Sequence, residues 1–293
     1  MDKLHFLSAW WCEINLLESD GHFALVDTGR AGDFSRIAAY LKLLGVKELD
    51  FILVSHFHND HFGSVCALLD AFPTGKVYVK PYSNVENVSD GGGQMSDEQR
   101  GRVQEEYLAF LAHIRQKSEL VLIYPEMPPV MLGSMRCTVY NADNILRKLY
   151  EDPESEYRQQ YIFNENNNSA IVYLESANGA SALLPGDCYD EPLSYLPGRF
   201  VIARTAQNIG KKVDVYKLAH HGCGEFTSLQ TAEILRPDYV LSTGEEKALF
   251  ASQNYKNLVA ANPAVQCMVT QNGYRVFTMA GAGRVTYETI PET

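Results

Sequence analysis

Short apolar runs separated by polar turns recur along the whole chain, and they predict alternating strands and helices. Apolar residues dominate Trp10–Leu17 and His22–Val26, and the Ser-Asp-Gly sequence between them is typical of a hairpin turn. The nearly all-apolar run Phe51–Ser55 predicts a strand that is buried on both faces. We expect the N-terminal stretch to form the first strand of the fold rather than a signal peptide, because acidic residues interrupt it early.

Apolar residues spaced three and four apart predict helices at Ser35–Leu44, Ser64–Leu69 and Thr227–Leu235. Another helix is expected after Ser96, which forms a capping box with Gln99, and its apolar face would consist of Val103, Tyr107, Phe110, Leu111 and Ile114. Further strands are expected at Lys76–Val79, Ile171–Leu174, Ala182–Leu184, Val213–Leu218 and Tyr239–Ser242. A closing β-meander is expected from Val265–Met268, Arg275–Thr278 and Arg284–Tyr287. With strands in both halves and no linker, the pattern predicts two packed sheets with helices outside, in one domain of residues 1–293.

The composition narrows the class of protein. The 293 residues are 46% hydrophobic and 21% charged, which is typical of a globular protein, and no run is long and apolar enough to span a bilayer. A net charge of −11 disfavours extended nucleic acid as a partner. The six cysteines form no CxxC pair, so we expect reduced thiols in a cytoplasmic protein with no membrane partner. The oligomeric state is not predicted.

The densest chemical pattern is the heptapeptide Ser-His-Phe-His-Asn-Asp-His that begins at Ser55. It places His56, His58, Asp60 and His61 directly after a predicted strand, where a tight loop can turn all four side chains inward. Imidazole nitrogen and carboxylate oxygen are ligands that suit zinc, iron or manganese. The sequence therefore predicts a transition-metal site here rather than a polar surface loop.

Two further strand ends carry similar chemistry. Asp187 follows the apolar run that ends Leu-Leu-Pro-Gly, a placement that suits a carboxylate bridging two metal ions. His220 and His221 follow another apolar strand, so that the two histidine clusters hold five of the eight histidines in the chain. Alone, each segment would read as an ordinary turn or a core histidine. Their shared position at strand ends favours one common site.

The HxHxDH pattern, preceded by a strand ending in Asp-Thr-Gly and followed by a Gly-Asp strand end and a late histidine, resembles the metallo-β-lactamase superfamily. The matching elements run from about Trp10 to the C-terminus. The resemblance implies an α/β fold, a four-layer αββα sandwich of two mixed sheets flanked by helices, with a metal site at one edge. Asn166-Asn167-Asn168-Ser169, Leu-Leu-Pro-Gly-Asp and Ala-His-His-Gly are similar to the hydrolase domain of ComEC-type competence proteins and to bacterial phosphorylcholine esterases, although Cys223 replaces the small hydroxyl residue usual in the competence pattern.

The resemblance also implies roles for individual residues. One divalent metal ion would be held by His56 and His58, and a second by Asp60, His61 and His220, with Asp187 as the bridge. We prefer His220 to His221 as the ligand, which leaves His221 as a candidate proton donor to the substrate or leaving group.

Two positions lie outside this ligand set. Asp27, in the Val-Asp-Thr-Gly strand end, is expected to accept a hydrogen bond from a ligand imidazole and fix its orientation. Many superfamily members supply a third histidine to the first metal near Ser169, where this chain has Asn168. The metal ion held by His56 and His58 would then be bound by an amide oxygen or extra water, or it would be bound weakly.

These features predict a metal-dependent hydrolase of a phosphodiester or related phosphoester. Two divalent ions about 3.5–4 Å apart, with zinc favoured over manganese or iron, would hold a bridging water and generate hydroxide at neutral pH, with Asp60 orienting that water. The expected partner is a small-molecule or phosphoester substrate. Two alternatives stay open: hydrolysis of a carboxylic ester, lactone or thioester by the same fold, and a metal-binding sensor without turnover.

Overall fold

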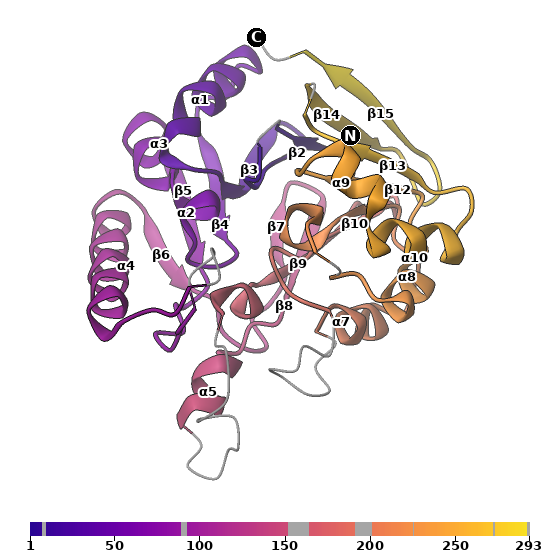
Figure 1. The fold of residues 1–293 in the computed structure, drawn as a ribbon. Helices are drawn as coiled ribbons and strands as arrows, with labels where there is room; N and C mark the ends of the chain where they lie inside the picture. Colours follow the sequence, from indigo (N-terminus) through magenta and orange to yellow (C-terminus); the bar gives the residue numbers. More distant parts are fainter. Residues whose placement is uncertain are drawn as a thin grey trace.

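Two β-sheets lie face to face between outer layers of helices (Figure 1). The computed structural model describes residues 1–7, 10–88, 93–151, 164–190, 201–224, 226–271 and 273–291. The predicted four-layer α/β arrangement is therefore confirmed. Within these residues, no helix is both long enough and apolar enough to cross a membrane.

The first sheet combines parallel and antiparallel pairing. Within the described residues its eight strands follow the order β15-β14-β1-β2-β3-β4-β5-β6, antiparallel from β15 to β3 and parallel from β3 to β6. The strands are β1 (Asp2–Phe6), β2 (Ile14–Ser19), β3 (His22–Thr28), β4 (Leu49–Val54), β5 (Thr74–Val79), β6 (Glu119–Leu122), β14 (Tyr274–Met279) and β15 (Val285–Ile290).

The second sheet is mixed in the same way. Its seven described strands follow the order β13-β12-β11-β10-β9-β8-β7, parallel from β13 to β10 and antiparallel from β10 to β7. They are β7 (Val130–Leu132), β8 (Met135–Tyr140), β9 (Ile171–Glu175), β10 (Ser181–Leu184), β11 (Val215–Lys217), β12 (Tyr239–Ser242) and β13 (Gln266–Val269).

Helices cover the outer face of each sheet (Figure 1). The first sheet is covered by α1 (Phe34–Leu43), α3 (Val65–Ala71) and α4 (Asp97–Lys117), with the single turn α2 (Asn59–Phe62) at its edge. The second half of the chain adds α5 (Ile145–Glu151), α7 (Val201–Ile209), α8 (Leu229–Leu235), α9 (Glu246–Ala251) and α10 (Gln253–Ala261). The predicted capping box is present: Gln99 N–H donates to Ser96 Oγ over 3.2 Å, and Ser96 N–H donates to Gln99 Oε1 over 2.8 Å.

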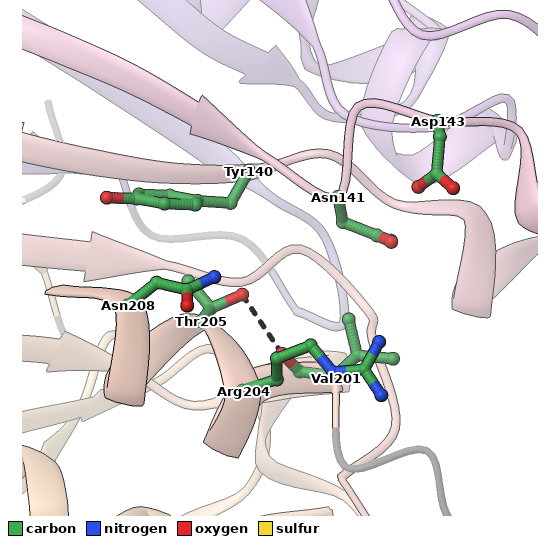
Figure 2. A pocket seen from close by; sticks show the side chains of 7 residues that line it. All are labelled: Tyr140, Asn141, Asp143, Val201, Arg204, Thr205 and Asn208. Carbon is green, nitrogen blue, oxygen red and sulfur yellow. Dashed lines mark hydrogen bonds between the residues drawn. The ribbon is translucent and has the colours of Figure 1, made fainter. Parts of the chain in front are cut away.

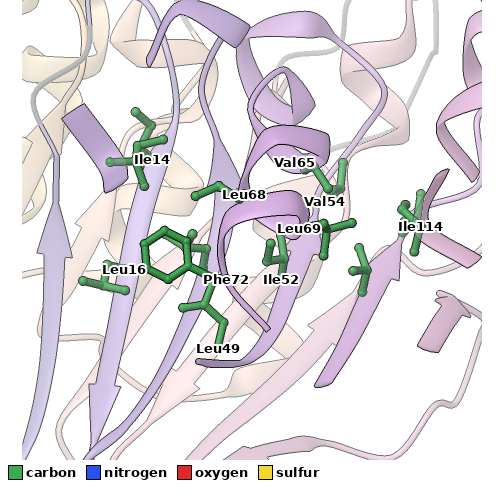
Figure 3. Close-up of a cluster of buried hydrophobic side chains, with 14 of the residues drawn as sticks. Ile14, Leu16, Leu49, Ile52, Val54, Val65, Leu68, Leu69, Phe72 and Ile114 are labelled. Carbon is green, nitrogen blue, oxygen red and sulfur yellow. The ribbon is translucent and has the colours of Figure 1, made fainter. Parts of the chain in front are cut away.

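Alternation along β4 shows how the layers are held together. Ile52 and Val54 pack into the core between the first sheet and its helices, beside Leu68 and Phe72 (Figure 3). Phe51, one position earlier, points to the opposite face and joins the core between the two sheets. A third core packs α7, α8 and α10 onto the second sheet. The all-apolar sequence of β4 follows from this burial on both faces.

Two sequence-based expectations about the elements are wrong. Trp10–Glu13 is not part of the first long strand, since β2 begins only at Ile14 and Trp11 adopts a left-handed backbone with φ of 51°. The C-terminal strands do not form a meander, because β13 pairs with β12 in the second sheet while β14 and β15 extend the first sheet beyond β1. Local strand patterns do not specify which sheet a strand joins.

The parallel strands of both sheets deliver their C-terminal ends to one edge of the sandwich. The last residues of β3 and the segments after β4, β10 and β11 carry all of the predicted site residues except Asn168. Asn168 reaches the same edge because β9, which follows it, runs antiparallel to β10. The edge is therefore where polar side chains from distant segments meet. Part of the polar stretch after Ser83, residues 89–92, lies outside the described residues.

Candidate metal centre

The histidine cluster is shaped by an abrupt change from strand to helix. His58 has an extended backbone, φ −111° and ψ 145°, and lies immediately before α2. The His61 N–H donates to the His58 carbonyl over 2.9 Å, so the chain turns within four residues. This turn brings side chains from the loop and from the helix to one side. His56 and His61 are fully buried, and His58 is 8% exposed.

The ligand atoms converge in two groups. In the first, His56 Nε2 lies 3.0 Å from His58 Nδ1. In the second, His221 Nε2 lies 3.2 Å from Asp60 Oδ2 and 3.4 Å from Asp187 Oδ2. His61 Nε2 lies 3.3 Å from the same Asp187 oxygen, which places this carboxylate beside both imidazoles.

Spacing among these atoms suits metal binding. One atom from each of His56, His61 and Asp187 lies within 4.8 Å of the others, and the same holds for Asp60, His61 and His221. The two sets share His61. Side chains predicted from three separate strand ends therefore meet in one place.

The opposite nitrogen of each imidazole contacts a polar group behind it. His61 Nδ1 lies 2.7 Å from Asp27 Oδ2, and His58 Nε2 lies 2.9 Å from Glu86 Oε1. His221 Nδ1 lies 2.9 Å from the Thr243 hydroxyl. Such contacts fix the orientation of a ring and leave its other nitrogen available as a ligand.

Asp27 lies where the sequence predicted an acceptor for a ligand imidazole. Its backbone is left-handed, with φ of 61°, at the end of β3. The carboxylate also accepts hydrogen bonds from the backbone N–H and the hydroxyl of Ser55, each over 2.7 Å. Ser55 Oγ in turn lies 3.1 Å from His56 Nδ1, so one carboxylate organises two of the imidazoles.

Unpaired buried atoms test whether a cation fits this site. Among the described residues, the buried atoms Asp60 Oδ1, Asp187 Oδ1, His61 Nε2 and His221 Nε2 form no hydrogen bond, although both nitrogens lie 3.2–3.4 Å from carboxylate oxygens. Buried polar atoms are normally paired, and four unpaired ligand-type atoms at one place match a site that divalent metal ions would complete. The residues present therefore fit the predicted metal centre.

The charges in the two groups differ. Burial lowers the pKa of the His56 imidazole well below its usual range, and the neighbouring His61 and His58 lower it further. Burial acts in the same direction on His61, but Asp187 and Asp27 outweigh it and hold the pKa of His61 well above its usual range. Burial would raise the pKa of Asp187, yet His221 and His61 hold it well below its usual range. Asp187 is thus an anion at neutral pH, ready for a cation.

The two histidines of the late pair differ in their distance from the carboxylates of the cluster. His220 and His221 both have left-handed backbones, with φ of 47° and 58°, and their ring centroids lie 5.9 Å apart. His221 contacts Asp60 and Asp187, whereas His220 Nε2 is 3.9 Å from Asp187 Oδ2. Of the two histidines, His221 lies nearer to both carboxylates, so its position favours it over His220 as a candidate ligand.

Glycine makes this turn feasible. Gly222 has φ of 84°, and a Cβ added to it would lie 2.4 Å from the Ser242 hydroxyl oxygen. Ser242 Oγ donates to the His221 carbonyl over 2.6 Å, so the end of β12 holds the turn in place. Any larger residue at Gly222 would push the turn away from β12 and displace the His221 ring.

His220 instead belongs to a polar wall beside the cluster. Its Nε2 lies 3.4 Å from Asn166 Nδ2, and Asn166 donates to the Tyr189 hydroxyl over 2.9 Å. The Tyr189 ring stacks on Phe226, with centroids 4.0 Å apart. The Tyr189 ring also lies next to the His220 ring, with centroids 5.4 Å apart.

Three further aromatic residues, Trp10, Trp11 and Tyr82, have different surroundings. Trp10 is 56% exposed, and Trp11 sits in the turn before β2. Tyr82 is buried beside Phe57 and Tyr107 in the helical core.

Asn168 is engaged by a buried carboxylate. Its Nδ2 donates to Glu165 Oε1 over 2.7 Å and to the Pro81 carbonyl over 2.8 Å, while its Oδ1 is buried and unpaired among the described residues. Burial raises the pKa of Glu165 to about 7. The backbone N–H of Glu165 also donates to Glu86 Oε1 over 3.4 Å, which connects this network to His58.

Sequence reasoning missed four buried charged residues at this edge: Glu13, Glu86, Glu165 and Lys217. Glu13 pairs with Lys217, and its Oε2 lies 3.8 Å from His221 Nδ1. A lysine inside the apolar strand before Ala-His-His-Gly was a usable signal, because a buried lysine needs a partner. Glu86 lies 28 positions from its histidine partner, and no local pattern predicts that contact.

Comparison with known proteins finds a family match over part of the chain. Residues 12–130 match the model of the Metallo-beta-lactamase superfamily. A protein named Hydroxyacylglutathione hydrolase from Aeromonas salmonicida is 41% identical over 63 residues, covering 22% of this chain and 23% of that protein. The uncharacterized protein YobT of Bacillus subtilis is 36% identical over 64 residues, covering 22% of this chain and 27% of that protein. The matches thus span about a quarter of the length of these curated relatives.

The overall fold has a solved counterpart. The metallo-beta-lactamase fold protein YhfI from Bacillus subtilis matches with a TM-score of 0.55 and 12% identity, over 98% of this chain and 100% of that one. Members of the superfamily are mostly metal-dependent hydrolases, and they typically bind two divalent metal ions. Residues 12–130 are thus similar to the metallo-β-lactamase superfamily, and the described chain has the fold of a solved metallo-beta-lactamase fold protein.

Proposed function

We propose that this chain is a metal-dependent hydrolase of a phosphodiester or related phosphoester. The observation that carries the proposal is the convergence of four imidazoles and two carboxylates, with unpaired ligand atoms on Asp60, Asp187, His61 and His221. His56 and His58 would hold one divalent ion. Asp60, His61 and His221 would hold a second, with Asp187 shared between them. Zinc suits this set of nitrogen and oxygen ligands, and manganese or iron are the alternatives.

Two metal ions bound here would lower the pKa of water to roughly 7 and stabilise negative charge on the reacting group. The protein's own groups supply orientation. Asp60 Oδ1 is buried and accepts no hydrogen bond within the described residues, so it is available to orient the attacking water. His220, on the polar wall with Asn166 and Tyr189, is placed to contact the substrate or leaving group, the role that the sequence had suggested for His221.

The choice of a phosphoester is supported by a cation beside the centre. Arg30 Nη2 lies 3.7 Å from Asp60 Oδ2, and the Arg30 side chain is 48% exposed. A guanidinium at the mouth of the site would attract an anionic phosphoryl group and bind its oxygens. The similarity of Asn166–Ser169 and the Ala-His-His-Gly segment to competence-type hydrolases and phosphorylcholine esterases supports the same choice.

A second candidate is the hydrolysis of a carboxylic ester, lactone or thioester. The relative from Aeromonas salmonicida that is named Hydroxyacylglutathione hydrolase favours it. Since that match covers 63 residues, it supports the shared metal chemistry more than a shared substrate. A non-catalytic metal sensor is the third candidate, favoured by the lack of a third histidine near Asn168.

The deciding experiment combines metal analysis with a substrate panel. Protein purified without chelator should contain up to two transition-metal ions per chain and should hydrolyse bis-p-nitrophenyl phosphate but not a lactone or a thioester. His58→Ala and Asp187→Ala should both remove this activity. Glu105→Gln, at an exposed position on α4, should retain it. Turnover of the lactone or thioester alone would favour the second candidate. Bound metal without turnover of any substrate would favour the sensor.

A further inference from the structure

Among the described residues, two lysines are completely buried where strands end at the functional edge, and their partners differ. Lys80 follows β5, and its ammonium donates to the carbonyls of Asn141 and Asp143, two residues that line a cavity of about 160 Å³ beside α7 (Figure 2). Lys80 is therefore held by backbone carbonyls. Lys217, the last residue of β11, instead forms an ion pair with the buried carboxylate of Glu13.

The Glu13–Lys217 pair is unfavourable to bury. The Glu13 side chain is 1% exposed, and the Lys217 side chain is 0% exposed. Neither Glu13 Oε2 nor Lys217 Nζ forms a hydrogen bond within the described residues, so their mutual attraction is what compensates the loss of water. In proteins, replacing such a pair by apolar side chains of similar volume is often neutral or stabilising. Stability alone therefore does not explain the charges at these two positions.

The pair joins the two sheets behind the metal centre. Glu13 immediately precedes β2 of the first sheet, and Lys217 ends β11 of the second. The Glu13 N–H donates to the Asp60 carbonyl over 3.1 Å, and the Glu13 carbonyl accepts from the Gly29 N–H over 2.8 Å. Glu13 Oε1 accepts from the Asn15 amide over 2.9 Å, while Oε2 reaches Lys217. The segment that carries Asp60 is thus tied to β11.

The ring of His221 lies close to the same carboxylate. Glu13 Oε2 is 3.8 Å from His221 Nδ1, and this nitrogen lies 2.9 Å from the Thr243 hydroxyl. The Thr243 carbonyl accepts a hydrogen bond from the Trp11 N–H over 3.2 Å, so the segment before β2 is bonded to this partner of His221 as well. The opposite ring nitrogen, Nε2, is 3.2 Å from Asp60 Oδ2. Glu13 therefore has contacts with both of the residues that meet there.

We propose that the Glu13–Lys217 ion pair positions His221 relative to Asp60 in the metal centre. Lys217 fixes the Glu13 carboxylate, and that carboxylate limits where the His221 ring can lie. Neither member of the pair belongs to the ligand set, so both are positioning residues. The proposal rests on the proposed function only in requiring that a divalent ion binds to Asp60, His61 and His221.

Metal binding tests this role without catalysis. Metal-free protein is titrated with Zn²⁺ against a chromogenic chelator, and separately with Co²⁺, whose visible absorption reports the arrangement of its ligands. Glu13→Gln keeps the shape of the side chain and removes its charge, and Lys217→Met removes the ammonium and keeps most of the length. Each should weaken binding of the first Zn²⁺ equivalent about tenfold or more and change the Co²⁺ absorption, because the support behind a ligand is lost.

The double variant Glu13→Gln/Lys217→Met separates positioning from stability. It leaves no unpaired charge buried, so its urea midpoint should recover most of what either single variant loses. Its Zn²⁺ affinity should stay about tenfold below that of the wild type, because the link between the sheets is still absent. Recovery of the affinity and the Co²⁺ absorption together with the urea midpoint would show a merely structural pair and overturn the proposal. This comparison needs only the double variant and the wild type, so it holds even where a single variant does not fold.

Glu18→Gln is the matched control on the same strand. Glu18 lies near the other end of β2 and pairs with Lys3 over 3.4 Å and with His5 over 3.1 Å. Its substitution should lower the urea midpoint and leave the Zn²⁺ affinity and the Co²⁺ absorption unchanged. Equal losses of affinity in Glu18→Gln and Glu13→Gln would show that any weakening of the first sheet loosens the metal, and would overturn the specific role of Glu13.

The outcomes separate this proposal from the proposed function. Zn²⁺ binding that depends on the pair, in a protein that hydrolyses no phosphoester, supports the positioning role and contradicts the function. Hydrolysis of bis-p-nitrophenyl phosphate, with wild-type Zn²⁺ affinity in the single and double variants, supports the function and overturns the positioning role. A wild-type protein that binds no divalent ion contradicts both.

Discussion

The His61 half and the His58 half of the metal centre differ in the groups that surround their imidazoles. His61 lies between two carboxylates, at 2.7 Å from Asp27 and 3.3 Å from Asp187. His56 has imidazoles on both sides, and the position where a third histidine was expected carries Asn168 instead. Carboxylates thus lie on both sides of His61, whereas His56 lies between imidazoles and the nearest carboxylate of its half is Glu86, which contacts His58.

This contrast teaches that ligand count alone does not describe the site. A cation in the His61 half would gain from anions that are already deprotonated and buried. The His58 half offers weaker attraction, but it borders a cavity between α2 and α4. We infer that the His61 half holds its metal ion tightly, whereas the His58 half is adapted to substrate access.

The largest effect is expected from removing the carboxylate that both halves share. Asp187→Ala should lower kcat/KM for the confirmed substrate about 10³-fold or more, beyond what the loss of one transition-state donor causes. It should also reduce the bound metal to less than one ion per chain, measured by atomic emission on protein purified without chelator. Asp190→Ala is not a suitable control, since the Asp190 carboxylate accepts hydrogen bonds from the hydroxyls of Ser228 and Thr231. An Asp187→Ala protein with full metal content and activity would exclude the shared-carboxylate model.

The next effect separates the two late histidines. His221→Ala should lower metal content and reduce kcat/KM on the order of 10²-fold, because the ring contacts both Asp60 and Asp187. His220→Ala should keep its metal and lose about tenfold in activity through weaker substrate contact. Parallel metal analysis and kinetics of the two variants provide the measurement. A reversed order would restore the assignment made from sequence.

The sequence predicted the parts of the fold that local patterns determine. The strand β4 is recognisable because burial on both faces requires Phe51–Val54 to be apolar without interruption. Ligand candidates at strand ends are recognisable for a similar reason, since parallel strands bring their C-terminal ends to one edge. The predicted helix at α4 was confirmed with its capping box and its buried face.

Other features depended on contacts between distant segments. The choice between His220 and His221 is made by two left-handed residues and by the packing of Gly222 against Ser242, neither of which a hydrophobic pattern encodes. The Glu165 carboxylate accepts a hydrogen bond from the backbone N–H of Ser83, which lies 82 positions earlier in the sequence. The β13 strand has the same alternation whichever sheet it joins, so the predicted meander could not be distinguished from the observed crossover.

A smaller effect is expected from the groups behind the imidazoles, and it measures the contrast between the halves directly. Asp27→Asn should weaken the tighter metal ion about 10- to 100-fold, because Asp27 orients His61 and, through Ser55, His56. Glu86→Gln should affect the weaker ion, since Glu86 contacts His58. Competition with a chromogenic chelator gives both affinities. If both variants weaken the same ion equally, the two halves are not distinct.

The smallest effect concerns Lys80, a buried lysine behind the His58 half of the site. Lys80 is fully buried at the end of β5, and its ammonium donates to the carbonyls of Asn141 and Asp143. Burial lowers the pKa of Lys80 to about 8, whereas an unfolded lysine titrates near 10.4. Between these values the unfolded chain binds more protons than the folded one, so the free energy of unfolding should rise with pH. Relative to Lys80→Met, the wild type should gain about 1–3 kcal/mol from pH 8 to 10.5 in urea unfolding. Lys76→Met, on the same strand but half-exposed beside Glu119, should show no such gain. A flat difference between wild type and Lys80→Met would mean that this lysine keeps an ordinary pKa, and that the end of β5 is more open to water than its burial indicates.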